Sequence, residues 1–283
     1  MKFESRNAAL VGAALIAAVP AVEAAKDAPG SPLAPSSKWQ LDYAPSECRL
    51  VRSFGRADQK VTLQIGRLDL DQNVELALAG HELPAINVEF VATVSTSTVK
   101  EVKIWASRYA EDDKSLGTFR FQPSNTLSAA LMSDVASGVP TRLRLHVPRR
   151  YDALLDLGSF KEPLRALDAC MDDLVAGWGL NPAEQRSRRS GPVPDQRSAT
   201  WFKAEDYPKQ LYGHSGIVVL RLLVGVEGKV ERCAVSKAGG DKAFEALTCE
   251  LATARAKFRP ALDASGKPIT SIWMQRIHWR SFQ

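Results

Sequence analysis

The feature that most constrains the fold lies near the end of the sequence. Residues 217–226 form an apolar run rich in valine and leucine, long enough for a β-strand. Glu227-Gly228 follows and supplies a tight turn, because glycine tolerates positive φ. Residues 230–235 then read as the returning strand, and Gly239-Gly240 ends it. The pattern predicts a β-hairpin.

A helix and a third strand are expected after this hairpin. Asp241 is a suitable N-cap for a helix that runs through Ala256, and Pro260 ends the segment. Residues 269–279 alternate between two sets of side chains, as a strand does. The sets are Ile272, Met274, Arg276 and His278 on one face and Trp273, Gln275, Ile277 and Trp279 on the other.

Several short motifs punctuate the same stretch. Tyr207-Pro208 precedes a short helix, and Gly216 precedes the long apolar strand. GKV stands at 228–230, FRPA at 258–261 and GKP at 266–268. Together they resemble the C-terminal domain of the TonB family, the periplasmic end of the energy transducers that serve outer-membrane receptors. The resemblance covers residues 201–283 and says nothing about the residues before them. The sequence departs from the family pattern at 237–240, where two serines and a glycine are usual.

The resemblance implies recognition rather than catalysis, with a three-stranded antiparallel sheet and helices on one of its faces. Domains of this family pair an extended receptor segment with an exposed sheet edge, through main-chain hydrogen bonds. The edge is expected at residues 269–279. The candidate contact residues are Gln275, Arg276, His278 and Arg280, although they could equally cover a solvated strand. Arg221 and Tyr212 are more distant candidates. No cofactor and no metal is implied.

The net charge of +5 is unevenly spread along the chain. Residues 201–283 carry 13 basic and 8 acidic side chains, whereas residues 25–180 carry 18 basic and 20 acidic ones. A modestly basic C-terminal region suits an acidic peptide or an anionic envelope surface. Nucleic acid is not expected as a partner, because the sequence has no basic helix and no stacking-aromatic motif.

Residues 1–24 have the pattern of a secretory signal peptide. Lys2 and Arg6 precede an apolar run of small residues, and Val22-Glu23-Ala24 fits a cleavage site. The expected product is a periplasmic protein that starts at Ala25. The alternative is an uncleaved inner-membrane anchor that faces the periplasm, and only then would the chain contact a membrane.

Four cysteines in an exported chain indicate two disulfides. Three pairings are open, as is a set of four free thiols. Domain organisation favours Cys48–Cys170 and Cys233–Cys249. On a helical wheel, Cys249 lies away from the stripe that begins at Phe244, so its bond would need the flank of the helix.

Residues 38–180 are expected to form a β-rich domain, so the fold class is α+β. Residues 25–37 are predicted to be a disordered tether, and residues 181–200 a linker, because both are rich in proline and polar residues. Helices are expected at 126–136 and 163–178. The expected strands are 39–43, 48–54, 60–68, 74–78, 86–94, 99–108, 117–121 and 142–147.

No catalytic constellation emerges. Gly213 to Gly216 superficially suggests a nucleophile elbow, but the strand follows the serine instead of preceding it. His81 and His146 are isolated from carboxylates at ligand spacing. We therefore expect no enzyme, but a TonB-like recognition protein of the periplasm linked by resemblance to energy-dependent outer-membrane transport. Its expected partner is a segment of an outer-membrane receptor or of another envelope protein. The alternative is a soluble periplasmic binding or scaffold module without energy transduction.

Overall fold

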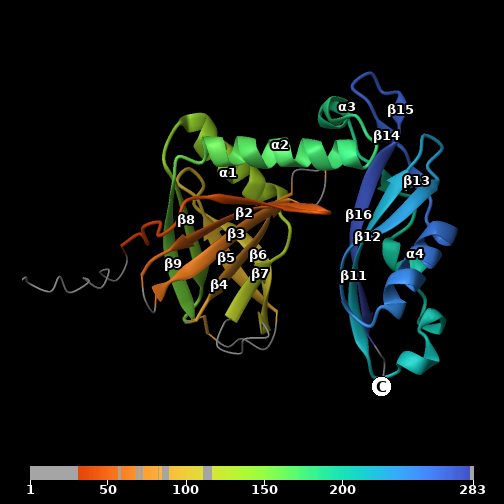
Figure 1. The fold of residues 1–283 in the computed structure, drawn as a ribbon, viewed down its shortest axis with the longest axis horizontal. Helices are drawn as coiled ribbons and strands as arrows, with labels where there is room; N and C mark the ends of the chain where they lie inside the picture. The colour runs from red at the N-terminus through yellow and green to blue at the C-terminus, as the bar shows by residue number, and fades with distance from the viewer. Residues whose placement is uncertain are drawn as a thin grey trace, which may run out of the picture. The chain divides into compact units, whose positions relative to one another are not determined.

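The computed structural model describes residues 31–280 except 57–58, 68–69, 71–72, 82, 85–88 and 111–116. Its first part is a nine-stranded antiparallel sheet in the order β1-β2-β3-β4-β7-β6-β5-β8-β9 (Figure 1). The alternating burial along β8 shows why these residues form strands, since every second side chain enters the core. The strands are β1 Gln40–Ala44, β2 Glu47–Phe54, β3 Val61–Arg67, β4 Glu75–Gly80, β5 Phe90–Ser95, β6 Val102–Ala110, β7 Gly117–Phe121, β8 Thr141–Val147 and β9 Tyr151–Gly158.

The segment before β1 closes this sheet by main-chain hydrogen bonds. The amide of Leu33 donates to the carbonyl of Leu154 (2.7 Å), and the amide of Asp156 donates to Leu33 (3.1 Å). The amide of Gly55, just after β2, donates to Ala34 (2.9 Å). The segment therefore links β9 to the residue that follows the last residue of β2. This corrects the prediction of a disordered tether for residues 33–36, which are held by pairing that composition does not reveal.

Two helices cover the first sheet. Helix α1 (Asn125–Ser137) begins at Ser124, whose hydroxyl accepts a hydrogen bond from Leu127, and it packs near β8. Helix α2 (Lys161–Gly177) lies against β1 and β2, and the Cys48–Cys170 disulfide ties it to β2. The predicted helices and this predicted pairing are present in the structure.

Strand β9 was absent from the strands expected from sequence. Its residues YDALLDLG contain Asp152 and Asp156, which disfavour strands, and its leucines favour helices. The period of two was nevertheless present, because Ala153, Leu155 and Leu157 are all buried.

Residues 181–200 are more ordered than their composition indicates. They contain α3 (Pro182–Ser187), the short β10 (Val193–Pro194) and most of the 3-10 helix η2 (Ser198–Trp201). β10 pairs with β13 (Phe258–Arg259), and the Trp201 side chain is buried in the core of the C-terminal sheet. These contacts are made with residues distant in sequence, so local composition carries no sign of them.

The second sheet has the order β12-β11-β16 and is antiparallel throughout. Its strands are β11 (Ser215–Val224), β12 (Val230–Gly240) and β16 (Ser271–Arg280). Helix α4 (Ala243–Arg255) covers one face (Figure 1). The remaining short elements are η3 Ala204–Asp206, η4 Lys209–Leu211, β14 Ala261–Leu262 and β15 Pro268–Ile269. The predicted α+β class and three-stranded sheet are confirmed.

Two boundaries differ from the predicted ones. Strand β12 continues through Gly240. A β-bulge shifts its pairing with β11 between Val219 and Leu220, so β12 carries one more residue than β11 there and remains paired beyond the shift. Helix α4 begins at Ala243 after an N-cap at Lys242, whereas Asp241 was expected as the N-cap. The Asp241 carboxylate still accepts a hydrogen bond from the Ala243 amide (2.9 Å), so it satisfies one free donor of the first turn.

Candidate partner-binding edge

Strand β16 is one of the two outer strands of the second sheet, with β12 as the other. It pairs with β11 from Ser215↔Arg280 to Val224↔Ser271, and no strand among the described residues pairs with its other side. An unpaired strand edge presents amide and carbonyl groups to any extended chain that reaches it. The outer edge of β16, like that of β12, therefore has no strand partner among the described residues.

The side chains of β16 divide between two faces as the alternation predicts. Trp273, Ile277 and Trp279 contribute to the core beneath α4. On the opposite face, Ile272 belongs to the core of the first sheet and Met274 packs against it. Both faces are thus largely occupied within the chain, and the strand edge remains for a partner.

The four candidate contact residues have different environments. Gln275 is half-buried, and its amide donates to the carbonyl of Arg276 (3.2 Å). The Arg276 guanidinium donates to the carboxylate of Glu75 on β4 (2.9 Å). His278 and Arg280 are exposed. Burial, followed by the charges of Arg276 and Arg280, lowers the pKa of His278, so its ring is neutral at pH 7.

The first residues of β16 are covered by α3. The Gln185 amide donates to the carbonyl of Thr270 (2.9 Å) and accepts from the Ser271 hydroxyl (2.6 Å). Gln185 and Ser271 are both buried. A partner chain would therefore have access to β16 only beyond Ser271, where all four candidate residues lie.

The GKV and FRPA motifs meet at the turn between β11 and β12. The amide of Phe258 donates a hydrogen bond to the carbonyl of Gly228 (2.9 Å). The backbones of Lys229 and Lys257 form an isolated antiparallel β-bridge. Gly228 has φ +74°, and a Cβ at that position would overlap the Phe258 carbonyl oxygen. Only glycine fits this approach, which explains why the two motifs occur together.

The segment containing Tyr207-Pro208 is held by a partly buried ion pair. The Asp206 carboxylate accepts two hydrogen bonds from Arg255 at the end of α4, one of 2.8 Å. The Tyr207 hydroxyl lies within hydrogen-bonding distance of the carbonyls of Leu211 (3.0 Å) and His214 (2.5 Å). These bonds fix the chain that leads into β11.

The core beneath α4 is aromatic and disulfide-linked. The ring of Phe244 stacks on Trp279 with centroids 5.5 Å apart, and the Trp279 indole donates to the Thr248 hydroxyl (2.8 Å). The Cys233–Cys249 disulfide joins β12 to α4, with Cys249 half-buried beside this core, as the helical wheel predicted. Thr248 was not anticipated, because a hydroxyl inside a helix stripe gives no sequence signal.

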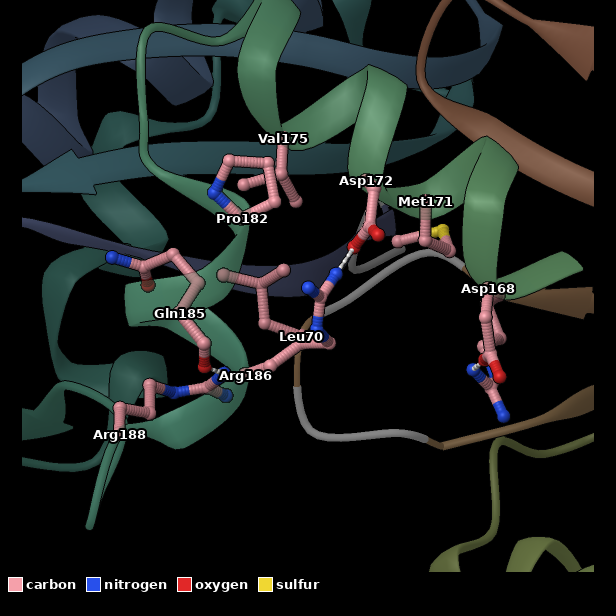
Figure 2. Close-up of a pocket in the computed structure, with 10 residues that line it drawn as sticks. Leu70, Asp168, Met171, Asp172, Val175, Pro182, Gln185, Arg186 and Arg188 are labelled. Carbon is pink, nitrogen blue, oxygen red and sulfur yellow. Dashed lines mark hydrogen bonds and ion pairs between the residues drawn. The ribbon is translucent and has the colours of Figure 1, made fainter. Parts of the chain in front are cut away.

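A separate polar pocket of about 70 Å³ lies between α2 and α3 (Figure 2). Two of its arginines pair with aspartates of the chain. Asp168 pairs with Arg67, and Asp172 pairs with Arg186, the pair joined by a dashed line in Figure 2. Among the described residues, no group of three or more His, Cys, Asp or Glu side chains is placed to hold a metal ion.

Comparison with protein families identifies the C-terminal part. Residues 204–281 match the family model described as "Gram-negative bacterial TonB protein C-terminal". This segment is a TonB-like C-terminal domain. It includes η3, η4, β11, β12, α4 and β16, and therefore the whole candidate edge. The family is associated with the cell envelope and is not enzymatic. No curated protein and no solved structure matched the chain.

The region before the TonB-like domain is the β-rich part described above, and it lies outside the matched residues 204–281. None of the helices in the described part of the chain combines the length and apolar character needed to span a membrane. The predicted signal peptide, residues 1–24, lies outside the described residues.

Replacement of Gly228 by alanine is expected to destabilise the TonB-like domain. Alanine at positive φ costs about 1–2 kcal/mol, and displacement of the Phe258 carbonyl adds about 1–3 kcal/mol. Urea unfolding measures the loss. The matched control is Gly213→Ala, since Gly213 has φ +87° but nothing within 4 Å of an added Cβ. Equal losses in the two variants would contradict the proposed close approach.

Asp206→Asn is expected to lower stability by about 1–3 kcal/mol at pH 7, because charge-assisted hydrogen bonds to Arg255 are lost. Hydrogen bonding from Arg255 is the main cause that lowers the pKa of Asp206. The carboxylate therefore stabilises the fold above about pH 4, and this contribution fades as pH falls through its folded pKa.

Urea midpoints measured between pH 7 and pH 3 test this dependence. The wild type should lose more stability on acidification than Asp206→Asn. The control is Glu205→Gln, whose side chain is exposed and which should retain the wild-type slope. A variant Asp206→Asn with an undiminished slope would show that the pair does not contribute.

Proposed function

We propose that this chain is a periplasmic recognition protein that binds an extended segment of another envelope protein by strand addition to β16. The observation that supports this most directly is the position of β16: it is an outer strand of the domain that matches the TonB family, with no strand among the described residues on its other side. Main-chain hydrogen bonds supply affinity in such an arrangement, and side chains along the edge supply selectivity. The chain has no catalytic role in this proposal.

The selective contacts would come from Gln275, Arg276, His278 and Arg280. Arg280 is exposed and cationic, so it would favour a carboxylate on the partner. Arg276 would have to exchange Glu75 for a partner group, since its guanidinium is already paired. The neutral, exposed ring of His278 would offer hydrogen bonds without charge.

The resemblance links this recognition to energy-dependent outer-membrane transport, with a receptor segment as the ligand. One observation favours the alternative of a soluble scaffold. Ile272 of β16 is buried in the core of the first sheet, and Arg276 is paired with that sheet. A mechanical force applied to β16 would therefore act on the first sheet as well. In a force-transducing domain, the force would instead be transmitted along the domain's own chain.

Photo-cross-linking in intact envelopes tests the edge. A photoreactive phenylalanine analogue at position 278 should cross-link to one extended partner segment, identified by mass spectrometry. The same analogue at Lys229, an exposed residue in the turn between β11 and β12, is the control and should not capture that segment. Arg280→Glu should lower the yield about two- to fivefold, as expected for one exposed charge pair. Equal capture from both positions would reject the edge.

Intact mass under non-reducing conditions tests export and cysteine pairing. We expect a chain that begins at Ala25 and is lighter by four hydrogens, because export by a cleaved signal peptide precedes oxidation of the four cysteines. Retention of Met1 would instead support an inner-membrane anchor and make the force-transducing function the better account.

A further inference from the structure

The face of the second sheet opposite α4 carries two arginines on adjacent strands. The register places Leu223 opposite Arg232 and Ile272, and Arg221 opposite Ala234 and Met274. The end of α2 lies against this face, where Trp178 follows the helix and is buried. A pocket of about 120 Å³ forms between them.

The guanidinium of Arg221 is unusual within this pocket. It stacks over the Trp178 ring, 4.2 Å from the ring centroid, and its Nη1 atom is buried without a hydrogen-bond partner. Arg232 donates to the Trp178 carbonyl (2.9 Å), so it is fixed beside the first guanidinium. None of the described residues that line the pocket is an aspartate or a glutamate.

The positive charges of Arg221 and Arg232 have no acidic partner among the described residues that line the pocket. Burial lowers the pKa of Arg221 first, and the nearby charge of Arg232 lowers it further. The guanidinium nevertheless stays protonated, because arginine begins far above neutral pH. In the pocket of Figure 2, by contrast, Arg67 and Arg186 each pair with an aspartate. A half-buried cation beside a like charge calls for an anion that the chain itself does not supply there.

The carboxyl end of α2 provides a hydrogen-bond acceptor for Arg232 but not for Arg221. Helix C-termini attract cations, and the bond from Arg232 to the Trp178 carbonyl is such a contact. Stacking on the indole ring offsets part of the burial cost of Arg221. Neither contact uses the Nη1 donor of Arg221, which is buried without a hydrogen-bond partner. The Arg221 side chain lines the pocket, so its guanidinium has hydrogen-bonding capacity that the chain does not use.

We propose that this pocket binds a small oxyanion, a carboxylate or phosphate group, through Arg221 with Arg232 as the second donor. Guanidinium groups bind both anions through parallel hydrogen bonds. Leu223, Ile272 and Ala234 provide an apolar wall, so a short alkyl stem fits beside the charged group. The site is separate from the strand edge, and it does not depend on strand addition.

Titration of the full exported chain with sodium propionate and with sodium phosphate tests the site, at ionic strength held constant with chloride. The readout is the indole NMR signal of Trp178, assigned with Trp178→Phe. We expect a saturable shift with at least one anion. A response to propionate alone would identify a carboxylate ligand, and a stronger response to phosphate a phosphate group. No saturable shift with either anion would overturn the proposal.

Arg221→Gln should weaken the apparent affinity at least about tenfold, because the charge and the buried donor are both lost. Arg142→Gln removes the same charge from an exposed position on β8 and should bind as the wild type does. Arg221→Lys retains the charge without the planar fork, so it should bind several-fold more weakly while preserving the fold. Equal affinities for Arg221→Gln and Arg142→Gln would reject the assigned donor.

Discussion

The TonB-like domain depends on the pairing of β11 on both sides. The main-chain amides and carbonyls of β11 form hydrogen bonds with β12 along one edge and with β16 along the other. This matters because β11 is buried on both faces, where backbone groups without hydrogen-bond partners would be costly. Leu220, Leu222 and Val224 enter the core beneath α4, while Leu223 packs toward the first sheet. Burial on both faces explains why residues 217–224 of this strand, apart from Arg221, are all apolar instead of alternating with polar residues.

This central pairing limits where a partner can bind. With α4 on one face and the first sheet against the other, a ligand has access to the outer edges of β16 and β12 or to openings between packed elements. The strand edge suits an extended chain, because its main-chain groups repeat along β16. The pocket lined by Arg221 and Arg232 suits a small charged group, because its volume of about 120 Å³ is too small for an extended chain and its two arginines are the donors that an anion requires. The two sites therefore select ligands of different size through different chemistry.

Much of the TonB-like domain could be predicted, because its signals are local. The turn at Gly228, the alternation along residues 269–279 and the periodic apolar positions of α4 each arise within one element. The contact between Gly228 and Phe258 could not be derived from spacing, although both motifs were recognised. In the first sheet, β9 was missed because its aspartates and leucines favour other structures, and its strand state depends on pairing with β8.

The candidate sites show the same division between local and long-range information. The order of β16 at the sheet edge followed from the resemblance, whereas the pairing of Arg276 with Glu75 links β16 to a strand of the first sheet. In the sequence, Arg221 was apparent as a polar residue in an apolar strand and as a more distant candidate for partner contact. Its significance arises from Trp178 at the end of α2, which covers it without supplying an acid. Single-sequence patterns thus locate the elements, while the unmatched charge becomes evident only when two distant elements pack together.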